Sequence, residues 1–255
     1  MSNIVSSAKG AGQPVILLHG FPFNQSLWDP LDSSLAALGY RIYTPDLPGF
    51  GTRAILPPAF TLEHVATEML QWINDEKIER AVLLGHSLGG YVTLEMVRQQ
   101  PGLFAGFGLL HSTAAADNPE KKESRNKAIE FIRRNGVLAF TTNFIEPLFA
   151  DPRNEFIPRV KKIASEAKEE AVIGYTTAMR DRNNQESVLK NFTGPVLFVA
   201  GEHDKGIPVE SVKEQASLCQ RSEVHILSSS AHMSMFEQTS DLTTVMAEFI
   251  SRCQA

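Results

Sequence analysis

Short apolar runs recur along this chain, and most of the stretches between them have helical periodicity. Six runs are apolar, partly β-branched and of strand length: 15–18, 41–44, 81–84, 107–110, 196–199 and 224–227. Strands that alternate with helices form a mainly parallel sheet covered by helices on both faces. The pattern therefore predicts a doubly wound α/β fold, in which ligands bind outside the carboxyl ends of the strands.

The alternation of strands and helices stops between Thr113 and Lys190. This segment has no convincing strand run, and four parts of it have the spacing of short amphipathic helices: 120–134, 137–149, 156–168 and 169–182. An all-helical insertion before the last two strands would lie over the strand ends as a lid. We therefore expect an α/β core formed by residues 1–112 and 191–255, and a helical cap formed by residues 113–190.

The apolar run 81–84 leads directly into Gly85-His86-Ser87-Leu88-Gly89, which has the form G-x-S-x-G. Residues 91–98 continue with helical spacing. A strand that turns into a helix within about one residue holds the serine in a strained conformation and exposes its hydroxyl at the sheet edge. Glycines fit on both sides of the serine because a Cβ there would crowd the turn. Ser87 is therefore a candidate nucleophile, although a serine in such a turn can also simply cap the helix.

Two later strand ends supply the other groups that a serine nucleophile needs. It requires a base that accepts its proton and an acid that orients this base. His232 follows the last apolar run, and Asp204 follows the run before it. The order Ser87, Asp204, His232 is typical of hydrolases with a serine at a strand-to-helix turn. We expect these three residues to be catalytic. His86 is expected to pack or form a hydrogen bond near the pocket wall, and His111 to be an ordinary structural histidine.

The chain resembles the α/β-hydrolase fold superfamily, in the branch with a helical cap that includes carboxylesterases and enol-lactonases. Five motifs at predicted strand ends carry the resemblance: His19-Gly20-Phe21-Pro22, Asp46-Leu47-Pro48-Gly49-Phe50-Gly51, Gly85-His86-Ser87-Leu88-Gly89-Gly90, Gly201-Glu202-His203-Asp204 and Ala231-His232-Met233. The resemblance implies an oxyanion hole formed by the backbone N–H groups of Phe21 and Leu88. Some relatives place the acid after the strand that corresponds to the fourth apolar run, 107–110. Asp117 is therefore a rival to Asp204.

A serine nucleophile disfavours the dehalogenase and epoxide hydrolase branches, whose covalent intermediates need a carboxylate. We expect a serine hydrolase that cleaves a small carboxylic ester or lactone through an acyl-enzyme intermediate. Two alternatives stay open: a carbon–carbon bond hydrolase with the same triad, and a weakly active ligand receptor or binding module. Arg180 or Arg182 is a candidate for binding a substrate carboxylate. Five apolar side chains are candidates for the substrate pocket: Phe23, Phe144, Phe149, Met179 and Met233.

Composition narrows the partners to small molecules. The 255 residues carry a net charge of −5, which argues against nucleic acid as a partner. No apolar stretch approaches the roughly 20 residues of a membrane span, and the first residues lack the apolar core of a signal peptide. We expect a cytoplasmic monomer or homodimer. Cysteines and histidines lack metal spacing, so neither a metal nor another cofactor is expected.

Ile4 and Val5 are expected to be a remnant of an antiparallel hairpin that relatives carry before the first strand.

Overall fold

The computed structural model describes residues 7–253, which contain a seven-stranded sheet in the order β1-β3-β2-β4-β5-β6-β7. β1 pairs with β3 in antiparallel fashion, and the other neighbouring strands are parallel. This arrangement confirms the doubly wound α/β prediction. The strands are β1 (Ser7–Lys9), β2 (Pro14–Leu18), β3 (Arg41–Thr44), β4 (Ala81–His86), β5 (Phe104–Leu110), β6 (Val196–Gly201) and β7 (Ser222–Leu227).

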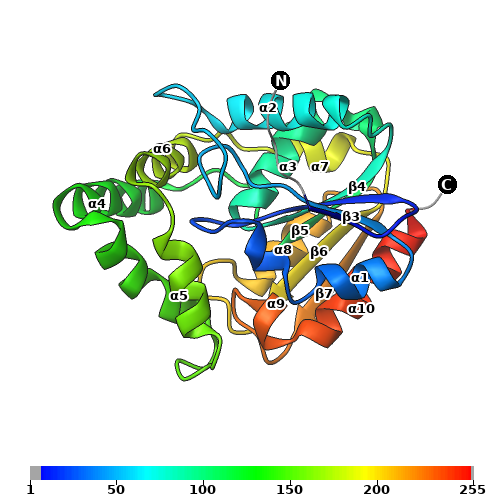
Figure 1. The fold of residues 1–255 in the computed structure, drawn as a ribbon. Coiled ribbons are helices and arrows are strands. Elements are labelled where there is room, and N and C mark those ends of the chain that lie inside the picture. The colour runs from blue at the N-terminus through cyan, green and yellow to red at the C-terminus, as the bar shows by residue number, and fades with distance from the viewer. Residues whose placement is uncertain (1–6, 254–255) are drawn as a thin grey trace.

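Helices cover both faces of this sheet (Figure 1). Apolar side chains of α2 (Leu62–Asp75), α3 (Leu88–Gln99), α7 (Glu186–Asn191) and α8 (Val209–Ala216) share one buried cluster with the sheet. The opposite face packs against α1 (Asp32–Ala37) and α10 (Thr239–Arg252), which follows the short α9 (Ser234–Glu237). The central strand β4 is buried along its whole length, as expected for a parallel strand with helices on both sides.

β5 and β1 depart furthest from the apolar runs of the sequence. β5 begins at Phe104, whereas the apolar run begins at Phe107. The run starts later because Gly106 interrupts the apolar pattern of the sequence. A Cβ on Gly106 would lie 2.5 Å from Cys253 Sγ, so the glycine lets the end of α10 approach the strand. β1 has three residues, which is too short for an alternating pattern to be recognised. Ile4 and Val5, the expected hairpin remnant, lie outside the described residues.

The helical cap lies between β5 and β6, as predicted, and forms a lobe beside the core (Figure 1). It contains α4 (Pro119–Ile145), α5 (Ile157–Ser165) and α6 (Glu169–Arg180). α4 is interrupted at Gly136, whose φ of 78° and ψ of 169° are not helical. The helix that follows α6, α7, contacts α3 and α8 of the core. The boundaries at residues 113 and 190 stay a prediction.

Side chains tie this cap to loops of the core. The buried Tyr175 hydroxyl of α6 donates a hydrogen bond to the carbonyl of Pro48 over 2.9 Å. On the α5 side, Arg159 Nη2 lies 2.6 Å from Asp29 Oδ2, and Asn24 donates to Glu166 over 3.2 Å. Because α4 packs against both α5 and α6, these contacts hold the cap at two places.

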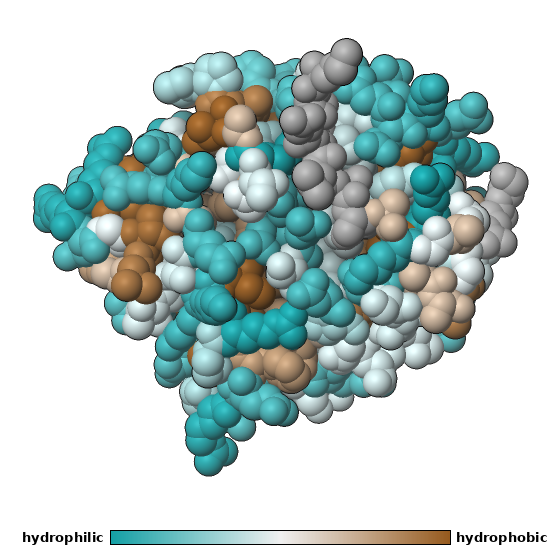
Figure 2. Space-filling model, in the orientation of Figure 1, coloured by the Kyte–Doolittle hydropathy of each residue, from teal (hydrophilic) through white to brown (hydrophobic). Residues whose placement is uncertain are grey.

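Hydrophobic residues appear as separate patches among hydrophilic ones on the face drawn in Figure 2. Scattered apolar residues of this kind are normal for a protein surface. The exposed large apolar residues among those described are Leu38, Ile55, Phe131, Leu138 and Ile226. Between residues 7 and 253, no helix combines the length and hydropathy needed to cross a bilayer.

Candidate active site

Ser87 lies at the sharp turn between β4 and α3, as the sequence predicts. Its φ of 51° and ψ of −112° are a strained conformation for a residue with a side chain. The turn is tight because glycines flank it: a Cβ on Gly85 would lie 2.3 Å from the carbonyl of Gly89, and a Cβ on Gly89 would lie 2.3 Å from the carbonyl of Leu18. The Ser87 N–H bonds to Leu110 O over 2.9 Å, which fixes the turn to β5.

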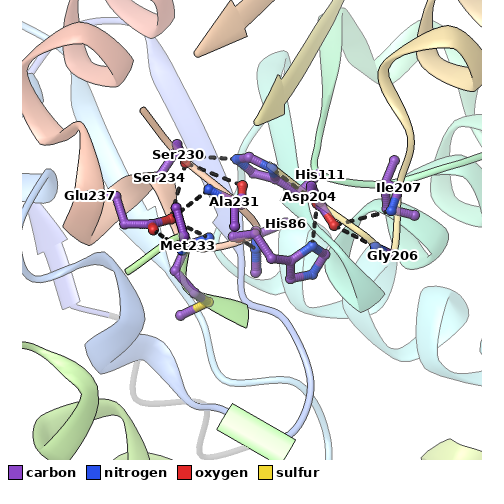
Figure 3. Close-up of polar contacts among 12 residues, drawn as sticks. His86, His111, Asp204, Gly206, Ile207, Ser230, Ala231, Met233, Ser234 and Glu237 are labelled. Carbon is purple, nitrogen blue, oxygen red and sulfur yellow. Dashed lines mark hydrogen bonds and ion pairs between the residues drawn. The ribbon is translucent and has the colours of Figure 1, made fainter. Parts of the chain in front are cut away.

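Asp204 and His232 lie in direct contact beyond the ends of β6 and β7. His232 Nδ1 is 2.6 Å from Asp204 Oδ2. The other carboxylate oxygen, Oδ1, accepts hydrogen bonds from the amides of Gly206 and Ile207 (Figure 3). Burial raises the pKa of Asp204, but its contacts with His232 and His111 outweigh burial and hold the pKa well below its usual range. The carboxylate is therefore ionised at neutral pH and can accept a proton-bearing Nδ1 of His232.

His111 is a second histidine on the same carboxylate. Its Nδ1 lies 3.4 Å from Asp204 Oδ2, and its Nε2 lies 2.7 Å from Ser234 Oγ. His111 has a φ of 50°, and burial lowers its pKa, which favours the neutral ring. The sequence predicted an ordinary structural role for His111 and did not predict its contact with Asp204. A signal was present, because His111 directly follows a strand at the same sheet edge.

His86 packs behind His232 and holds its backbone. The Nε2 of His86 lies 2.9 Å from the carbonyl of His232, so this nitrogen donates the hydrogen bond. Burial and the neighbouring histidines lower the pKa of His86 well below its ordinary value. A Cβ on Gly20 would lie 2.4 Å from His86 Nδ1, so a larger residue would displace the ring. His86 is a buried support of His232 and does not line the cavity beside Ser87.

Glu237 fixes the loop that carries His232 (Figure 3). Its Oε2 accepts hydrogen bonds from the amides of Ala231 and Met233 over 3.0 and 3.3 Å, and lies 3.2 Å from Ser230 Oγ. Its Oε1 accepts a bond from the amide of Ala150, over 2.6 Å, in the segment that follows α4. Glu237 was not predicted from the sequence, although it is the one charged residue in the run 233–237.

A second contact between this loop and the cap joins the amide of His232 to the carbonyl of Leu148, over 2.9 Å. The segment 148–150 thus bonds both to the backbone of His232 and to Glu237. The position of His232 therefore depends on the cap as well as on the core.

Asp117, the rival acid, contacts arginines and not His232. Arg182 Nη1 lies 2.7 Å from its Oδ1, and Arg125 Nε bonds to its Oδ2. Burial raises the pKa of Asp117, but the hydrogen bonds and charges of the two arginines lower it further than burial raises it. Arg182 also lies over Tyr91, with 4.1 Å between the guanidinium carbon and the ring centre. The structure therefore joins His232 to Asp204 and leaves Asp117 in a separate ion-pair network.

A cavity of about 310 Å³ lies beside Ser87, between the core and the cap. Ser87, Asp204 and His232 line it together with Phe21, whose amide is one of the two expected oxyanion donors. Leu88, the other, is the first residue of α3, so its N–H is among those that a helix leaves without an acceptor in its own backbone. Ser87 and His232 therefore face one common space that a small substrate can occupy.

The expected substrate-pocket residues are divided between this cavity and the core. Phe144 and Met179 line the cavity, whereas Phe23, Phe149 and Met233 are buried elsewhere. Phe23 and Met233 belong to the apolar cluster under the α1 and α10 face of the sheet, so packing between core elements accounts for them. Phe140, which the sequence did not single out, lines the cavity instead. It stacks on Phe144 with 5.1 Å between the ring centres.

The two arginines expected to bind a substrate carboxylate do not line the cavity. Arg182 is buried against Asp117, and Arg180 Nη2 lies 2.7 Å from Asp181 Oδ2 and bonds to Asn126 through Nη1. The cations that do line the cavity are Lys121, Arg125 and Lys205. Lys121 and Arg125 are one helical turn apart on α4, a spacing that is present in the sequence.

Three groups at this site have the composition of a metal site, since ligand atoms of His111, Asp204 and His232 lie within 4.8 Å of one another. The 2.6 Å between His232 Nδ1 and Asp204 Oδ2 is a hydrogen-bond distance. Two ligands of a tetrahedral zinc ion, each about 2.0 Å from the metal, would lie roughly 3.3 Å apart. The geometry fits a proton between these two atoms better than a metal.

The family of the protein follows from comparisons with known proteins. The model of the alpha/beta hydrolase family matches residues 15–243, and the chain belongs to this family. It is 28% identical over 252 residues to the dihydrolipoyllysine-residue acetyltransferase component of the acetoin cleaving system of Pseudomonas putida. That match covers 94% of this chain and 64% of the relative, so the chain spans less than two thirds of the other protein.

Two solved structures are similar over nearly the whole chain. A thermophilic esterase from Thermogutta terrifontis is 27% identical with a TM-score of 0.93, covering 99% of this chain and 94% of the other. The enol-lactonase from Burkholderia xenovorans LB400 is 19% identical with a TM-score of 0.89, covering 98% of both chains, and supports the fold alone. Hydrolytic chemistry is therefore the function class that the family indicates.

Proposed function

We propose that this protein is a serine hydrolase that cleaves a small carboxylic ester or lactone through an acyl-enzyme intermediate. The observation that carries the proposal is the 2.6 Å contact between His232 and Asp204 beside a cavity that Ser87 also lines from a strained turn. A base with its orienting acid and an exposed hydroxyl at one cavity is the arrangement that nucleophilic acyl transfer requires.

In this mechanism His232 Nε2 takes the proton of the Ser87 hydroxyl while Oγ attacks the carbonyl carbon of the substrate. The carbonyl double bond becomes an oxyanion, and the imidazolium then gives its proton to the leaving alcohol oxygen as the ester bond breaks. Water repeats the sequence: His232 takes a proton from it, the hydroxide attacks the acyl carbon, and Ser87 Oγ leaves with the proton. Asp204 keeps Nδ1 of His232 protonated throughout, which leaves Nε2 free to act.

The oxyanion of both tetrahedral intermediates would be stabilised by the amides of Phe21 and Leu88. Leu88 N–H is at the amino end of α3, where backbone donors and the helix dipole favour negative charge. Loss of one such donor typically lowers turnover by about 10²- to 10³-fold. These donors are backbone groups, so side-chain replacement at either residue would test packing more than catalysis.

The comparisons support an ester-type substrate without naming one. The relative from Thermogutta terrifontis is described as an esterase. A serine at the nucleophile position is consistent with acyl transfer, whereas an alkyl-enzyme ester would need a carboxylate there. Ser87, Asp204 and His232 could also hydrolyse a carbon–carbon bond. This alternative is tested with the wild type, Ser87→Ala and a substrate that carries such a bond.

The test is hydrolysis of p-nitrophenyl acetate and butyrate by the wild type and by Ser87→Ala. We expect turnover by the wild type and a loss of at least about 10⁴-fold in kcat for the variant, since the nucleophile is removed. A fluorophosphonate should label the wild type and Ser124→Ala but not Ser87→Ala. Ser124 is the matched control because it is another serine that lines the cavity. Equal rates in wild type and Ser87→Ala, or an unlabelled wild type, would refute a serine hydrolase and favour a binding module.

A further inference from the structure

Three cationic side chains line the cavity beside Ser87: Lys121 and Arg125 from α4, and Lys205 from the loop after β6. Within residues 7–253, Lys121 and Lys205 have no ion-pair partner. Among the described lining residues, Asp204 is the single acid, and its oxygens are engaged by His232 and two amides. The cavity therefore has a surplus of positive charge in a protein whose net charge is −5.

The ion pairs next to the cavity add to this surplus. Arg125 is paired with Asp117, but Asp117 is also bonded to Arg182. Two guanidinium groups thus share one carboxylate, and both arginines stay charged under all physiological conditions. The cluster of Asp117, Arg125 and Arg182 carries a net charge of +1, and Arg125 lies in the cavity wall. Glu120 and Glu123 of the same helix are exposed and do not line the cavity.

The break in α4 separates this charged wall from an apolar one. Before Gly136, the helix contributes Lys121, Ser124, Arg125 and Ala128 to the cavity, at the i, i+3, i+4 and i+7 spacing of one helical face. After Gly136, the same helix contributes Phe140 and Phe144. These rings pack with Phe21, at 6.2 and 6.0 Å between ring centres. One part of the cavity therefore suits a hydrocarbon chain and another part suits an anion.

We propose that the substrate is a small ester or lactone that carries a carboxylate in addition to the bond that is cleaved. The lysines and Arg125 attract this carboxylate, while Phe21, Phe140 and Phe144 pack against the carbon chain. This inference rests on the proposed serine hydrolase function and narrows its substrate class. It replaces the expectation that Arg180 or Arg182 binds the carboxylate.

The test compares esters that differ only in a terminal carboxylate. Monoethyl adipate and ethyl hexanoate place the difference on the acyl side of the ester, and 4-acetoxybutyrate and butyl acetate place it on the alcohol side. Hydrolysis is followed in a pH-stat at low ionic strength. In at least one pair, we expect kcat/KM for the anionic ester to exceed kcat/KM for the neutral ester by roughly tenfold or more. Each charge contact contributes a factor of about two to five. The preference should shrink at high salt, where charges are screened over a few ångströms.

The variants Lys121→Gln and Lys205→Gln identify the source of any preference. Together they should lower kcat/KM for the anionic ester by roughly fivefold to tenfold and leave the neutral ester within about twofold. Lys122→Gln is the matched control, because Lys122 is the exposed neighbour of Lys121 and does not line the cavity. It should leave both members of each pair unchanged.

A binding measurement separates failure of this proposal from failure of the proposed function. Ser87→Ala, with and without the two lysine substitutions, is titrated calorimetrically with monoethyl adipate and 4-acetoxybutyrate. Binding of either anion that the lysine substitutions weaken, without turnover by the wild type, would support the anion site and refute the hydrolase. Turnover that is equal for both members of each pair and unaffected by the lysine substitutions would overturn the carboxylate proposal and leave the hydrolase standing.

Discussion

Asp204 and Asp117 are two buried carboxylates that follow neighbouring parallel strands, and each contacts two basic side chains. Asp204 follows β6 and contacts His111 and His232, whereas Asp117 follows β5 and contacts Arg125 and Arg182. In both, burial raises the pKa, but the contacts with the two basic side chains lower it by more than burial raises it. The carboxylates are thus alike in burial and ionisation, and they differ in the bases that they hold.

This difference shows that the partner decides what a buried carboxylate can do. An imidazole can gain and lose a proton near neutral pH, so a carboxylate that holds one can support proton transfer. A guanidinium stays protonated, so a carboxylate that holds two can only fix their positions and charge. Asp204 therefore serves proton movement in the proposed mechanism, and Asp117 organises the charged wall of the cavity.

Asp204→Asn is the sharpest test of the comparison. The amide loses the negative charge and can favour the wrong tautomer of His232, so we expect kcat to fall by about 10⁴-fold with the fold retained. Ester turnover and near-ultraviolet circular dichroism measure the two properties. If Asp204→Asn stayed close to wild type while Asp117→Asn lost its activity, the assignment of the acid would be reversed.

Asp117→Ala should act on stability rather than on the chemical step. It leaves Arg182 buried without its carboxylate, which typically costs about 3–5 kcal/mol of unfolding free energy. Urea denaturation measures this loss. Asp181→Ala is the control, since Asp181 forms a partly exposed pair with Arg180 and its removal should cost less than about 1 kcal/mol. An equal cost for both variants would contradict the distinction between a buried network and a surface pair.

Acidification should lower the stability first through buried histidines, two of which lie next to His232, and only at lower pH through Asp204 and Asp117. Burial lowers the pKa of His86 and His111, so the unfolded chain binds protons below about pH 6.5 while the native state does not. Stability then falls with decreasing pH, by at most about 1.4 kcal/mol per pH unit for each histidine. His19, whose pKa is also lowered by burial, adds a third contribution.

The two carboxylates respond later, because their lowered pKa values keep their stabilisation intact above about pH 4. Urea denaturation between pH 7 and pH 4.5 measures the slope. Asp117→Asn should leave the slope of unfolding free energy against pH unchanged. His111→Asn should reduce this slope by the contribution of one histidine, at most about 1.4 kcal/mol per pH unit. A slope that depended on Asp117 instead would place the acid sensitivity in the arginine network.

Glu237→Gln should give the smallest of these effects. Both oxygens of Glu237 accept backbone hydrogen bonds, and an amide retains one acceptor oxygen while its NH₂ group faces a donor. We expect kcat to fall by roughly fivefold to tenfold with little change in KM, because the loop of His232 shifts. Glu248→Gln on the exposed face of α10 is the control. A rise in KM at constant kcat would instead indicate that Glu237 affects only substrate binding through the cap.

The sequence predicted the sheet, the cap and the strand-end motifs because those signals are local. Ser87 is recognised from its neighbouring glycines, and Asp204 and His232 from their places after apolar runs. The network of Asp117 could not be predicted, since its hydrogen bond to Arg182 spans 65 positions and depends on how α4 and α6 pack. The same packing decides that Phe140 lines the cavity and that Phe23 lies in the core. Periodicity shows which side of a helix is apolar but does not show which neighbour it meets.

The bonds from the segment 148–150 to the amide of His232 and to Glu237 make assembly of the candidate site depend on the cap. The serine turn lies between β4 and α3 and is bonded to β5, all of them core elements, whereas the loop of His232 is completed by residues that arrive with the cap. A core from which the cap had been deleted would retain the turn of Ser87 and lose these anchors of the His232 loop. In an order of folding in which the core forms first, the candidate site would be complete only after the cap docks.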